Sequence, residues 1–377
     1  LQFKLTVLLQ RINLLNYKNY DTLKVEFNHK FNLINGLNGS GKTNLIDSIH
    51  YLCLCKSYFT RSDNNVVKHG NSYFRLDGFF DLDGISTQIT CKLTGLGTGG
   101  IKGGKKEFFK NDEPYERLAD HIGLIPVVMI APDDIAIIND GSEERRRFLD
   151  TAIAQVSHEY LTRLMHYNKL LQQRNALLKH NLAYGHLDKT LLDVLNAQLA
   201  VDGDYIFAER KAYLEQFSKV FGEHYHLISG ENEVGAVQYL SQAAEKQHLQ
   251  LFHDNLRDDL SAGRTTAGIH KDELELTING YPVRETGSQG QIKSFLIAMK
   301  IAQYMLMLVL KGKKSIMLLD DVFEKLDKKR LETVFAIFNQ PAFEQVFITD
   351  ADEKRSAEFC LNQIGAFGHV IIGDNNN

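Results

Sequence analysis

The chain has 377 residues, of which 44% are hydrophobic and 24% charged, so we expect a soluble globular protein of about two or three domains. Its formal net charge of −4 excludes a generally basic nucleic-acid binder but is compatible with a local basic face. The apolar runs, such as residues 122–131, are shorter than the roughly 20 residues that cross a bilayer. Residues 1–17 lack the cleavage pattern of a signal peptide, and four cysteines without a Cys-x-x-Cys pair suit a reducing cytoplasm.

The first 60 residues predict a strand, a glycine-rich loop and a helix in that order. Residues 1–35 carry short strand patterns that end in FNLIN, and GLNGSGKT follows at 36–43. The next segment, LIDSIHYLCLC, has apolar residues at the three- and four-residue spacing of a helix.

Further along the chain, residues 71–110 are typical of short strands joined by a glycine-rich, basic hairpin tip at 95–106. VVMIAPDDIAII at 127–138 predicts a strand that runs into a turn at Pro132. Between about 142 and 221 glycine and proline almost vanish and leucines recur at helical spacing, which predicts two or three long helices that break near 180–188 and form a separate lobe. Residues 265–377 return to strand and helix patterns.

The loop at 36–43 fits the phosphate-binding pattern G-x-x-x-x-G-K-[ST]. Glycines let consecutive backbone N–H groups point at phosphate oxygens, and the helix that follows adds a partial positive charge. A chance match in a flexible turn is the alternative, but the flanking strand and helix favour a nucleotide site. The predicted nucleotide-binding residues here are Gly36, Leu37, Asn38, Gly39, Ser40, Gly41, Lys42 and Thr43, with Lys42 on the β- and γ-phosphates and Thr43 on Mg²⁺.

An acidic strand end supplies the metal partner that such a loop needs. SIMLLDDVFEKLD at 315–327 has four apolar residues followed by Asp320 and Asp321, which is the Walker B arrangement. We expect Asp320 to hold Mg²⁺ through water and Asp321 to act as base or orienter toward the attacking water. The alternative is a core strand that ends in an acidic turn. Asp321 and Lys42 are the predicted catalytic residues.

A third stretch, residues 285–306, resembles the signature motif of ABC-type ATPases. Ser288, Gly290 and Gln291 keep the places of the usual Leu-Ser-Gly-Gly-Gln pattern, whereas Gly287 and Gln289 depart from it. A serine and free amides at a helix N-terminus make a second anion site. An ordinary helix cap is the alternative. The predicted nucleotide contacts, made on the ATP of a partner chain, are Ser288, Gln289, Gly290 and Gln291.

Five ordered stretches together resemble the RecF family of bacterial recombination mediators along nearly the whole chain: residues 36–59, 131–150, 262–276, 287–303 and 318–334. The stretch between Lys42 and Gly290 is too long for a transporter ATPase and far too short for a structural-maintenance (SMC) protein with its coiled coil. The resemblance implies an α/β P-loop NTPase fold, an ABC-type head with a mixed sheet, flanking helices and an inserted, mostly helical lobe. The expected division is residues 1–140 and 263–377 for the ATPase lobe and 141–262 for the helical lobe.

The same resemblance implies the function and partners. It implies weak ATPase activity with ATP and Mg²⁺, an ATP-dependent homodimer that pairs head to tail, and DNA binding at gaps or single-strand/double-strand junctions in the cytoplasm. It further implies work with RecO and RecR to load RecA. The rival functions are an SMC-like ATP-binding protein without turnover, the nucleotide-binding subunit of a transporter, and a P-loop kinase.

Two features leave the resemblance incomplete. Where many ABC-type proteins have a switch histidine, VFITDAD carries Thr349 and Asp350, so the γ-phosphate contact from this loop is open. His270 lies beside two acids, which suggests either a metal site or, as we favour, structural support.

DNA contact has to be local because the chain is acidic overall. Phosphate contacts from Lys and Arg are independent of base sequence and weaken with salt. Such basic runs are also common on solvated faces, and the arginine triplet has a rival role as a brace between lobes. The candidate DNA-binding residues are Lys102, Lys105, Lys106, Arg145, Arg146 and Arg147, with Lys110 nearby.

Overall fold

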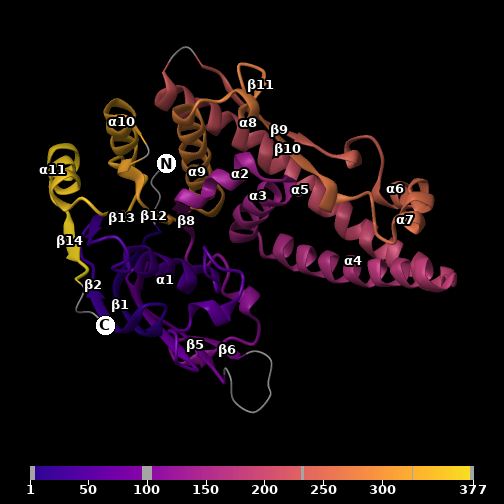
Figure 1. Cartoon of the computed structure of the whole chain (residues 1–377), viewed down its shortest axis with the longest axis horizontal. Coiled ribbons are helices and arrows are strands. Elements are labelled where there is room, and N and C mark those ends of the chain that lie inside the picture. The colour runs from indigo at the N-terminus through magenta and orange to yellow at the C-terminus, as the bar shows by residue number, and fades with distance from the viewer. Residues whose placement is uncertain (1–4, 96–103, 231–232, 325, 374–377) are drawn as a thin grey trace. The chain divides into compact units, whose positions relative to one another are not determined.

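The computed structural model describes residues 5–95, 104–230, 233–324 and 326–373, and divides the chain into two compact units (Figure 1). Unit 1 comprises Leu1–Asp134, His224–Glu231 and Ser288–Asn377. Unit 2 comprises Ile135–Glu223 and Asn232–Gly287.

A parallel five-stranded sheet forms one layer of unit 1. Its order is β14 (Gly368–Ile371), β3 (Phe31–Asn35), β13 (Gln345–Asp350), β12 (Ile316–Leu319) and β8 (Val127–Ile130). Every residue of β3, β8, β12 and β13 is buried. Continuous burial is typical of parallel strands covered on both faces, and it explains why β8 and β12 read as unbroken apolar runs.

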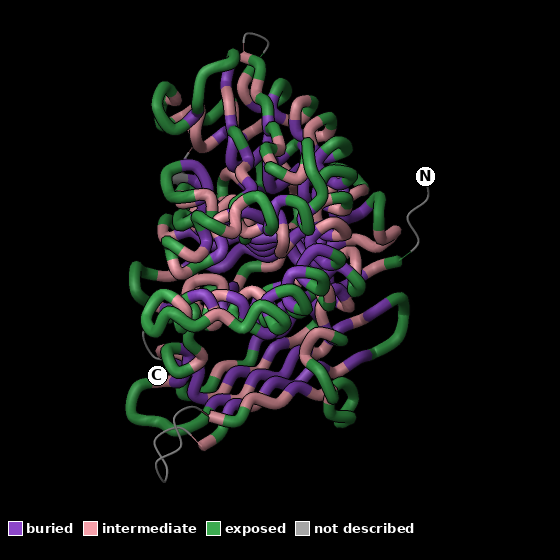
Figure 2. The backbone as a smooth tube through the Cα atoms, turned by 90° about the vertical axis from the view of Figure 1, so that its right-hand side faces the viewer, coloured by how far each residue is buried: buried purple, intermediate pink, exposed green. Residues whose placement is uncertain are grey.

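An antiparallel six-stranded sheet forms the other layer. Along its strands buried and less buried residues alternate in many places, because only one face of such a sheet packs on the core (Figure 2). Its order is β2 (Tyr20–Glu26), β1 (Val7–Tyr17), β4 (Phe74–Leu82), β5 (Ile85–Thr94), β6 (Lys105–Lys110) and β7 (Glu113–Pro114).

Helix α1 (Lys42–Leu54) lies between these two sheets. It contacts β8 and β13 of the parallel sheet and β1, β4 and β5 of the antiparallel sheet. All of its residues except Thr43 and Asn44 are buried. The glycine-rich loop therefore enters a helix that is packed on several sides, which holds the loop in place.

The remaining helices of unit 1 are α9 (Gln289–Lys311), α10 (Lys328–Phe338) and α11 (Glu353–Ile364). By length and composition α9 could cross a membrane, since its mean hydropathy reaches 1.5, but 78% of that stretch is buried inside the structure. Burial of this extent is that of a core helix, and α9 contacts β8. The four cysteines are free and buried.

Unit 2 is built on long helices. They are α3 (Ser142–Val156), α4 (His158–Tyr184) and the part of α5 (Lys189–Ser229) up to Glu223. The Ser157 side chain caps α4, and Gly185, at φ +69°, ends it in the left-handed region. The predicted long helices and their break near 180–188 are confirmed. Four short helices complete the set: α2 (Ala136–Asn139), α6 (His248–Asp254), α7 (Leu256–Ala262) and α8 (Val283–Thr286).

Unit 2 also contains a small antiparallel sheet, in the order β11 (Tyr281–Pro282), β10 (Glu273–Ile278) and β9 (Gly235–Leu240). This sheet moves one expected boundary. The sequence pattern places the return to the ATPase lobe at residue 263, whereas the structure keeps the chain in unit 2 up to Gly287. The reason is that β10 pairs with β9 along its whole length, and strand patterns do not reveal which partner a strand will take.

Candidate nucleotide-binding site

The glycines of the loop between β3 and α1 are required by its geometry. Gly41 has φ +113°, and a Cβ there would lie 2.6 Å from the Tyr20 hydroxyl oxygen. A Cβ on Gly36 would lie 2.4 Å from the carbonyl oxygen of Ile372. Both positions therefore exclude a side chain. Gly41 is also the N-cap of α1 and offers no capping side chain, so the first amides of the helix are left for an anion.

Asn19 holds this loop from the neighbouring β1–β2 turn. Its amide nitrogen donates to the carbonyl oxygen of Ser40 at 3.1 Å. Its amide oxygen accepts from the side chain of Asn44 at 2.7 Å. The sequence analysis missed Asn19, because no local pattern links a hairpin turn to a loop some 20 residues further along the chain.

Lys42 points its ammonium group back at the loop. The side-chain nitrogen donates to the carbonyl oxygens of Gly36 at 2.8 Å and Leu37 at 3.0 Å, and the residue is only 6% exposed. These partners are neutral, so the charge has no counter-ion among them. The Ser40 hydroxyl is buried and has no hydrogen-bond partner within the described part of the chain. A phosphate group would satisfy both, so the residues fit a nucleotide.

Thr43 and Asp320 meet beside the loop. The Thr43 hydroxyl donates to the two carboxylate oxygens of Asp320 at 3.0 and 3.2 Å, and Asp320 is 2% exposed. A hydroxyl and a carboxylate are the oxygen ligands that Mg²⁺ takes beside substrate phosphates. The pair therefore fits the predicted metal. Asp321, partly buried, has φ +49° and its backbone N–H donates to the Thr349 hydroxyl at 3.0 Å.

Ser288 begins α9 as a capping box. Its hydroxyl accepts from the Gln291 backbone N–H at 3.3 Å, and the Gln291 side chain accepts from the Ser288 backbone N–H at 2.8 Å. Ser288 and Gln289 are exposed. A Cβ on Gly290 would lie 2.7 Å from a guanidinium nitrogen of Arg330, which the sequence analysis did not single out. The helix-cap interpretation is correct as geometry, and the cap leaves an exposed helix tip with a cation beside it.

A buried carboxylate anchors the middle of α1. Asp47 is 0% exposed and accepts from the hydroxyls of Tyr17 at 2.8 Å and Ser57 at 2.7 Å. It also accepts from the Tyr58 backbone N–H at 2.7 Å and pairs with the Lys18 ammonium at 2.7 Å. Three of these contacts are on Oδ2 and one is on Oδ1, so the buried charge is both paired and hydrogen-bonded, which is what such a charge needs.

The same segment leads on to α9. The Tyr58 hydroxyl contacts the Asp134 carboxylate and accepts from the Lys300 ammonium at 2.9 Å. Lys300 and Asp134 form a buried ion pair at 2.7 Å, and Asp134 also accepts from the Ala131 backbone N–H. This cluster of Tyr58, Asp134 and Lys300 ties the segment after α1 to the helix that carries Ser288.

Comparison with known proteins identifies the chain's relatives. A family model described as the RecF/RecN/SMC N-terminal domain matches residues 8–367. The DNA replication and repair protein RecF of Parabacteroides distasonis is 39% identical over 355 residues, which is 94% of each chain. The same-named protein of Flavobacterium johnsoniae is 39% identical over 348 residues, 92% of this chain and 95% of its own.

The chain belongs to the RecF family.

Solved structures agree with this membership. A structure named for the recombination mediator protein RecF with ATP, in the RecFOR pathway, is 29% identical, has a TM-score of 0.83 and covers 92% of both chains. An SMC head domain from Pyrococcus furiosus, 16% identical over 93% of this chain and 91% of its own with a TM-score of 0.53, shares the fold. The predicted α/β P-loop fold, an ABC-type head related to RecF and SMC heads, is confirmed.

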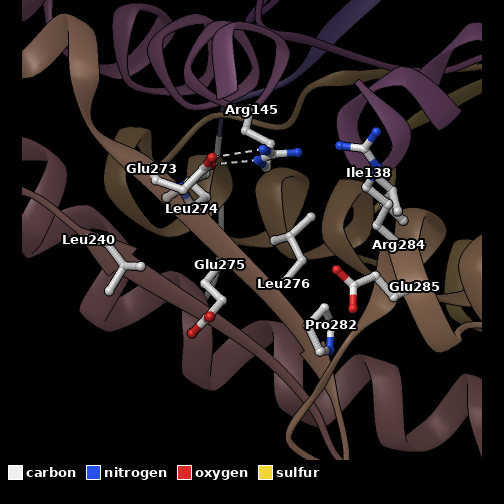
Figure 3. Close-up of a pocket in the computed structure, with 10 residues that line it drawn as sticks. All are labelled: Ile138, Arg145, Leu240, Glu273, Leu274, Glu275, Leu276, Pro282, Arg284 and Glu285. Atoms are coloured by element: carbon white, nitrogen blue, oxygen red, sulfur yellow. Dashed lines mark hydrogen bonds and ion pairs between the residues drawn. The ribbon is translucent and has the colours of Figure 1, made fainter. Parts of the chain in front are cut away.

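The arginines of the RecF-like segment at 131–150 make structural contacts inside unit 2. Arg145 forms two hydrogen bonds with the Glu273 carboxylate, at 2.6 and 2.8 Å (Figure 3). Arg146 donates to the Asp272 carbonyl oxygen at 2.6 Å. Arg147 is 42% exposed and pairs with Glu143 and Glu144 of its own helix. These contacts favour a bracing role within unit 2 for Arg145 and Arg146 and leave Arg147 accessible to a phosphate.

Arg145 also lines a shallow pocket of unit 2 with a volume of about 190 Å³ (Figure 3). The pocket lies beside β10 and β11, and Figure 3 shows the Arg145–Glu273 pair at one side and the Glu275, Arg284 and Glu285 side chains around it. Its walls mix apolar and charged side chains.

The candidate DNA-binding lysines also differ in how exposed they are and in what they pair with. Lys105 is 75% exposed and pairs with Glu107. Lys106 is 20% exposed, pairs with Asp63 at 2.7 Å and donates to a backbone carbonyl, so it ties β6 to its surroundings. Lys102 lies outside the described residues.

His270, in the RecF-like segment at 262–276, is a partly buried, neutral side chain. Its Nε2 lies 3.2 Å from the Thr265 carbonyl oxygen, which can only accept, so Nε2 carries the hydrogen. Nδ1 then accepts from the Tyr167 hydroxyl at 3.0 Å. Burial lowers the pKa of His270 to about 4. Asp272 pairs instead with Arg210 at 2.9 Å, and no cluster of three or more metal-ligating side chains occurs in the described residues. The structure thus favours support over a metal site.

Proposed function

We propose that this RecF-family chain is an ATP-dependent DNA-binding protein of recombinational repair and replication-fork maintenance, and that ATP pairs two chains into a clamp. The observation that carries the proposal is the arrangement at the loop. Within the described residues, the buried Lys42 ammonium contacts neutral carbonyl oxygens and the Ser40 hydroxyl has no hydrogen-bond partner. Both lie on one strand–loop–helix unit with Thr43, which contacts the buried Asp320 at the end of β12. Each of these groups is satisfied by a magnesium–triphosphate.

Each group of residues at the nucleotide site has its own role. The amides of residues 36–43 and the Lys42 ammonium hold the β- and γ-phosphates. Thr43 and Asp320 would hold Mg²⁺, which would neutralise charge that develops on the phosphates. Asp321 orients the attacking water as a general base. Hydrolysis is slow and serves to release the clamp.

Pairing uses the exposed tip of α9. The capping box keeps Ser288 and Gln291 in one geometry before any ligand arrives, so little ordering is needed on binding. Ser288–Gln291 of one chain contact the γ-phosphate held by the other chain. ATP then stabilises the dimer by mass action, because it contacts both partners.

The clamp acts at gapped DNA or at single-strand/double-strand junctions in the cytoplasm, near the nucleoid. It helps RecO and RecR to load RecA. Support for this pathway comes from the solved relative, whose name places RecF in the RecFOR pathway. Exposed cations such as Lys105, Lys110 and Arg147 contact the DNA phosphates. Such contacts do not depend on the base sequence.

Size-exclusion chromatography with light scattering tests this function. The wild-type chain should be a monomer alone and a dimer with ATP and Mg²⁺, and gapped DNA should co-elute only with the dimer. Lys42→Ala should bind no nucleotide and stay monomeric. Asp321→Asn should bind ATP, release no phosphate and accumulate as a dimer. A wild-type chain that stays monomeric at saturating ATP would contradict the clamp, and a dimer without phosphate release would favour an SMC-like protein without turnover.

A further inference from the structure

The buried hydroxyl of Thr349 contacts both acidic residues that follow β12. Thr349, which is 0% exposed, follows Ile348 on β13, and Ile348 pairs in parallel register with Leu319. The register therefore sets Thr349 beside Asp320. The Thr349 hydroxyl donates to Asp320 Oδ1 at 2.7 Å and accepts from the Asp321 backbone N–H at 3.0 Å. A single hydroxyl thus uses its hydrogen on one acid and its lone pair on the next.

Asp321 depends on such a contact because its backbone is strained. At φ +49° it lies in the left-handed region, which non-glycine residues seldom adopt. Strain of this kind persists only where the surroundings hold it. The hydrogen bond from the Asp321 N–H to Thr349 holds that peptide and with it the direction in which the carboxylate leaves the chain.

Asp320 is held from two sides. Its Oδ1 accepts from Thr349 at 2.7 Å and from the Thr43 hydroxyl at 3.0 Å. Threonine is branched at Cβ, and a buried branched side chain in a strand has few rotamers, so its hydroxyl is a rigid donor. The carboxylate orientation is therefore set by the protein before a ligand binds.

The neighbouring residue on β13, Asp350, has different partners. Asp350 is 0% exposed, and its carboxylate pairs with Arg355 at 2.9 Å. Its carbonyl oxygen accepts from the Asn35 side chain at 2.9 Å. Of the two residues that stand where many ABC-type ATPases have a switch histidine, only Thr349 contacts the acids of β12.

We propose that Thr349 is a positioning residue for ATP hydrolysis, which acts through Asp320 and Asp321 and not on the phosphate. This inference rests on the proposed function. Removing the hydroxyl removes the hydrogen bond between the Asp321 N–H and Thr349 and lets the Asp321 peptide relax out of the left-handed region. A displacement of about 1 Å at a catalytic group can lower a rate about 100-fold. The loop at 36–43 is untouched, so nucleotide affinity without metal should not change.

The test compares Thr349→Val, which keeps the branched shape and removes the hydroxyl, with Thr349→Ser, which restores it. Three quantities are measured on the full chain: ATP affinity without metal, the Mg²⁺ concentration that half-saturates ATP binding, and kcat with KM for phosphate release. For Thr349→Val we expect unchanged metal-free affinity and KM, a several-fold higher half-saturating Mg²⁺ concentration, and kcat lowered by about 10- to 100-fold. Thr349→Ser should lie close to wild type in all three.

Thr90→Val is the matched control. Thr90 is a buried threonine of unit 1 on the antiparallel sheet, and its hydroxyl donates to Asp77 at 2.6 Å. This variant should lose thermal stability as Thr349→Val does but keep kcat and the Mg²⁺ dependence. If Thr349→Val is not obtained folded, Thr349→Cys carries the same expectation at smaller size, because a thiol is a weak hydrogen-bonding group.

The outcomes separate the two proposals. A wild-type chain that hydrolyses ATP, together with Thr349→Val or Thr349→Cys at wild-type kcat and Mg²⁺ dependence, overturns the positioning role alone. Equal losses in Thr349→Ser and Thr349→Val also overturn it. A wild-type chain that binds ATP but releases no phosphate overturns the proposed hydrolysis, and the positioning role with it.

Discussion

At the scale of single residues, the site is built from groups whose own contacts are incomplete. Lys42 has given up most of its hydration, at 6% exposed, for two neutral carbonyl oxygens. A buried ammonium is far more stable beside an anion than beside neutral dipoles. The nearby Ser40 hydroxyl is also buried and finds no hydrogen-bond partner in the part of the chain that the structure describes. An anion bound here would remove both penalties, which is why the loop is suited to phosphate.

His270 gives a residue-scale prediction for stability against pH. Burial holds its folded pKa at about 4, whereas an unfolded histidine has a pKa of about 6.5. The contribution of neutral His270 to the free energy of unfolding is therefore complete above pH 6.5. It is lost as pH falls toward 4, because the unfolded chain then binds the proton more readily. At about 1.4 kcal/mol per pKa unit, the loss is at most about 3.5 kcal/mol. The cations that further oppose protonation are Lys271, Arg146 and Arg174.

The measurement is the free energy of unfolding in urea at several pH values between 7 and 4. His50 and His121 also have pKa values lowered to about 4 by burial, so wild type alone does not isolate one histidine. His270→Gln should therefore lose less stability than wild type over this window. Parallel curves for the two proteins would contradict the assignment of a partly buried, neutral His270.

At the scale of secondary-structure elements, two helices carry the predicted nucleotide contacts and a buried cluster joins them. α1 carries Lys42, and Asp47 ties its middle to the segment that contains Tyr58. Tyr58 in turn contacts Asp134, which pairs with Lys300 of α9. The charges of this cluster compensate one another. Removing one member therefore leaves its partner uncompensated in a low-dielectric interior.

Lys300→Met tests this cluster. The substitution leaves the Asp134 carboxylate buried at 4% exposed without its cation, and we expect the free energy of unfolding to fall by roughly 3–5 kcal/mol. The double variant Lys300→Met with Asp134→Asn should recover part of that loss, since the uncompensated charge is gone. Lys246→Met is the control, because Lys246 pairs with Asp254 at the surface and should leave the urea midpoint unchanged. A small loss in Lys300→Met, with no recovery in the double variant, would contradict the buried pair.

At the scale of the whole molecule, we propose that a second copy completes the nucleotide site. Ser288 lies at the exposed tip of α9, whereas Lys42 is the buried first residue of α1. In a head-to-tail dimer each site takes its loop from one chain and its serine from the other. A substitution of Lys42 and a substitution of Ser288 would then each damage a different half of the same site.

Mixing two inactive variants tests this arrangement. Lys42→Ala should bind no ATP, and Ser288→Arg should bind ATP as a monomer but not pair, because the larger cation blocks the helix tip. An equimolar mixture of the two contains dimers with one intact site, formed by the loop of the Ser288→Arg chain and the serine of the Lys42→Ala chain. We expect ATP-dependent dimers in light scattering only from the mixture. A mixture that behaves as the sum of its components would show that each chain completes its own site.

The local motifs of this protein are determined by its sequence. The glycine loop, the apolar run before Asp320 and the helical stretch after 142 each depend on backbone geometry and periodicity that neighbouring residues set, so the parallel strands and long helices are predictable from them. The resemblance to RecF, confirmed by comparison, rests on the same ordered stretches.

Only the tertiary structure decides which distant residues meet. It brings Asn19 to the loop and Thr349 to both acids, and it commits Arg145 and Arg146 to Glu273 and the Asp272 backbone. It also pairs β10 with β9 and so extends unit 2 to Gly287. Contacts of this kind depend on strand register and on the packing of separate segments, and no local pattern encodes either of them.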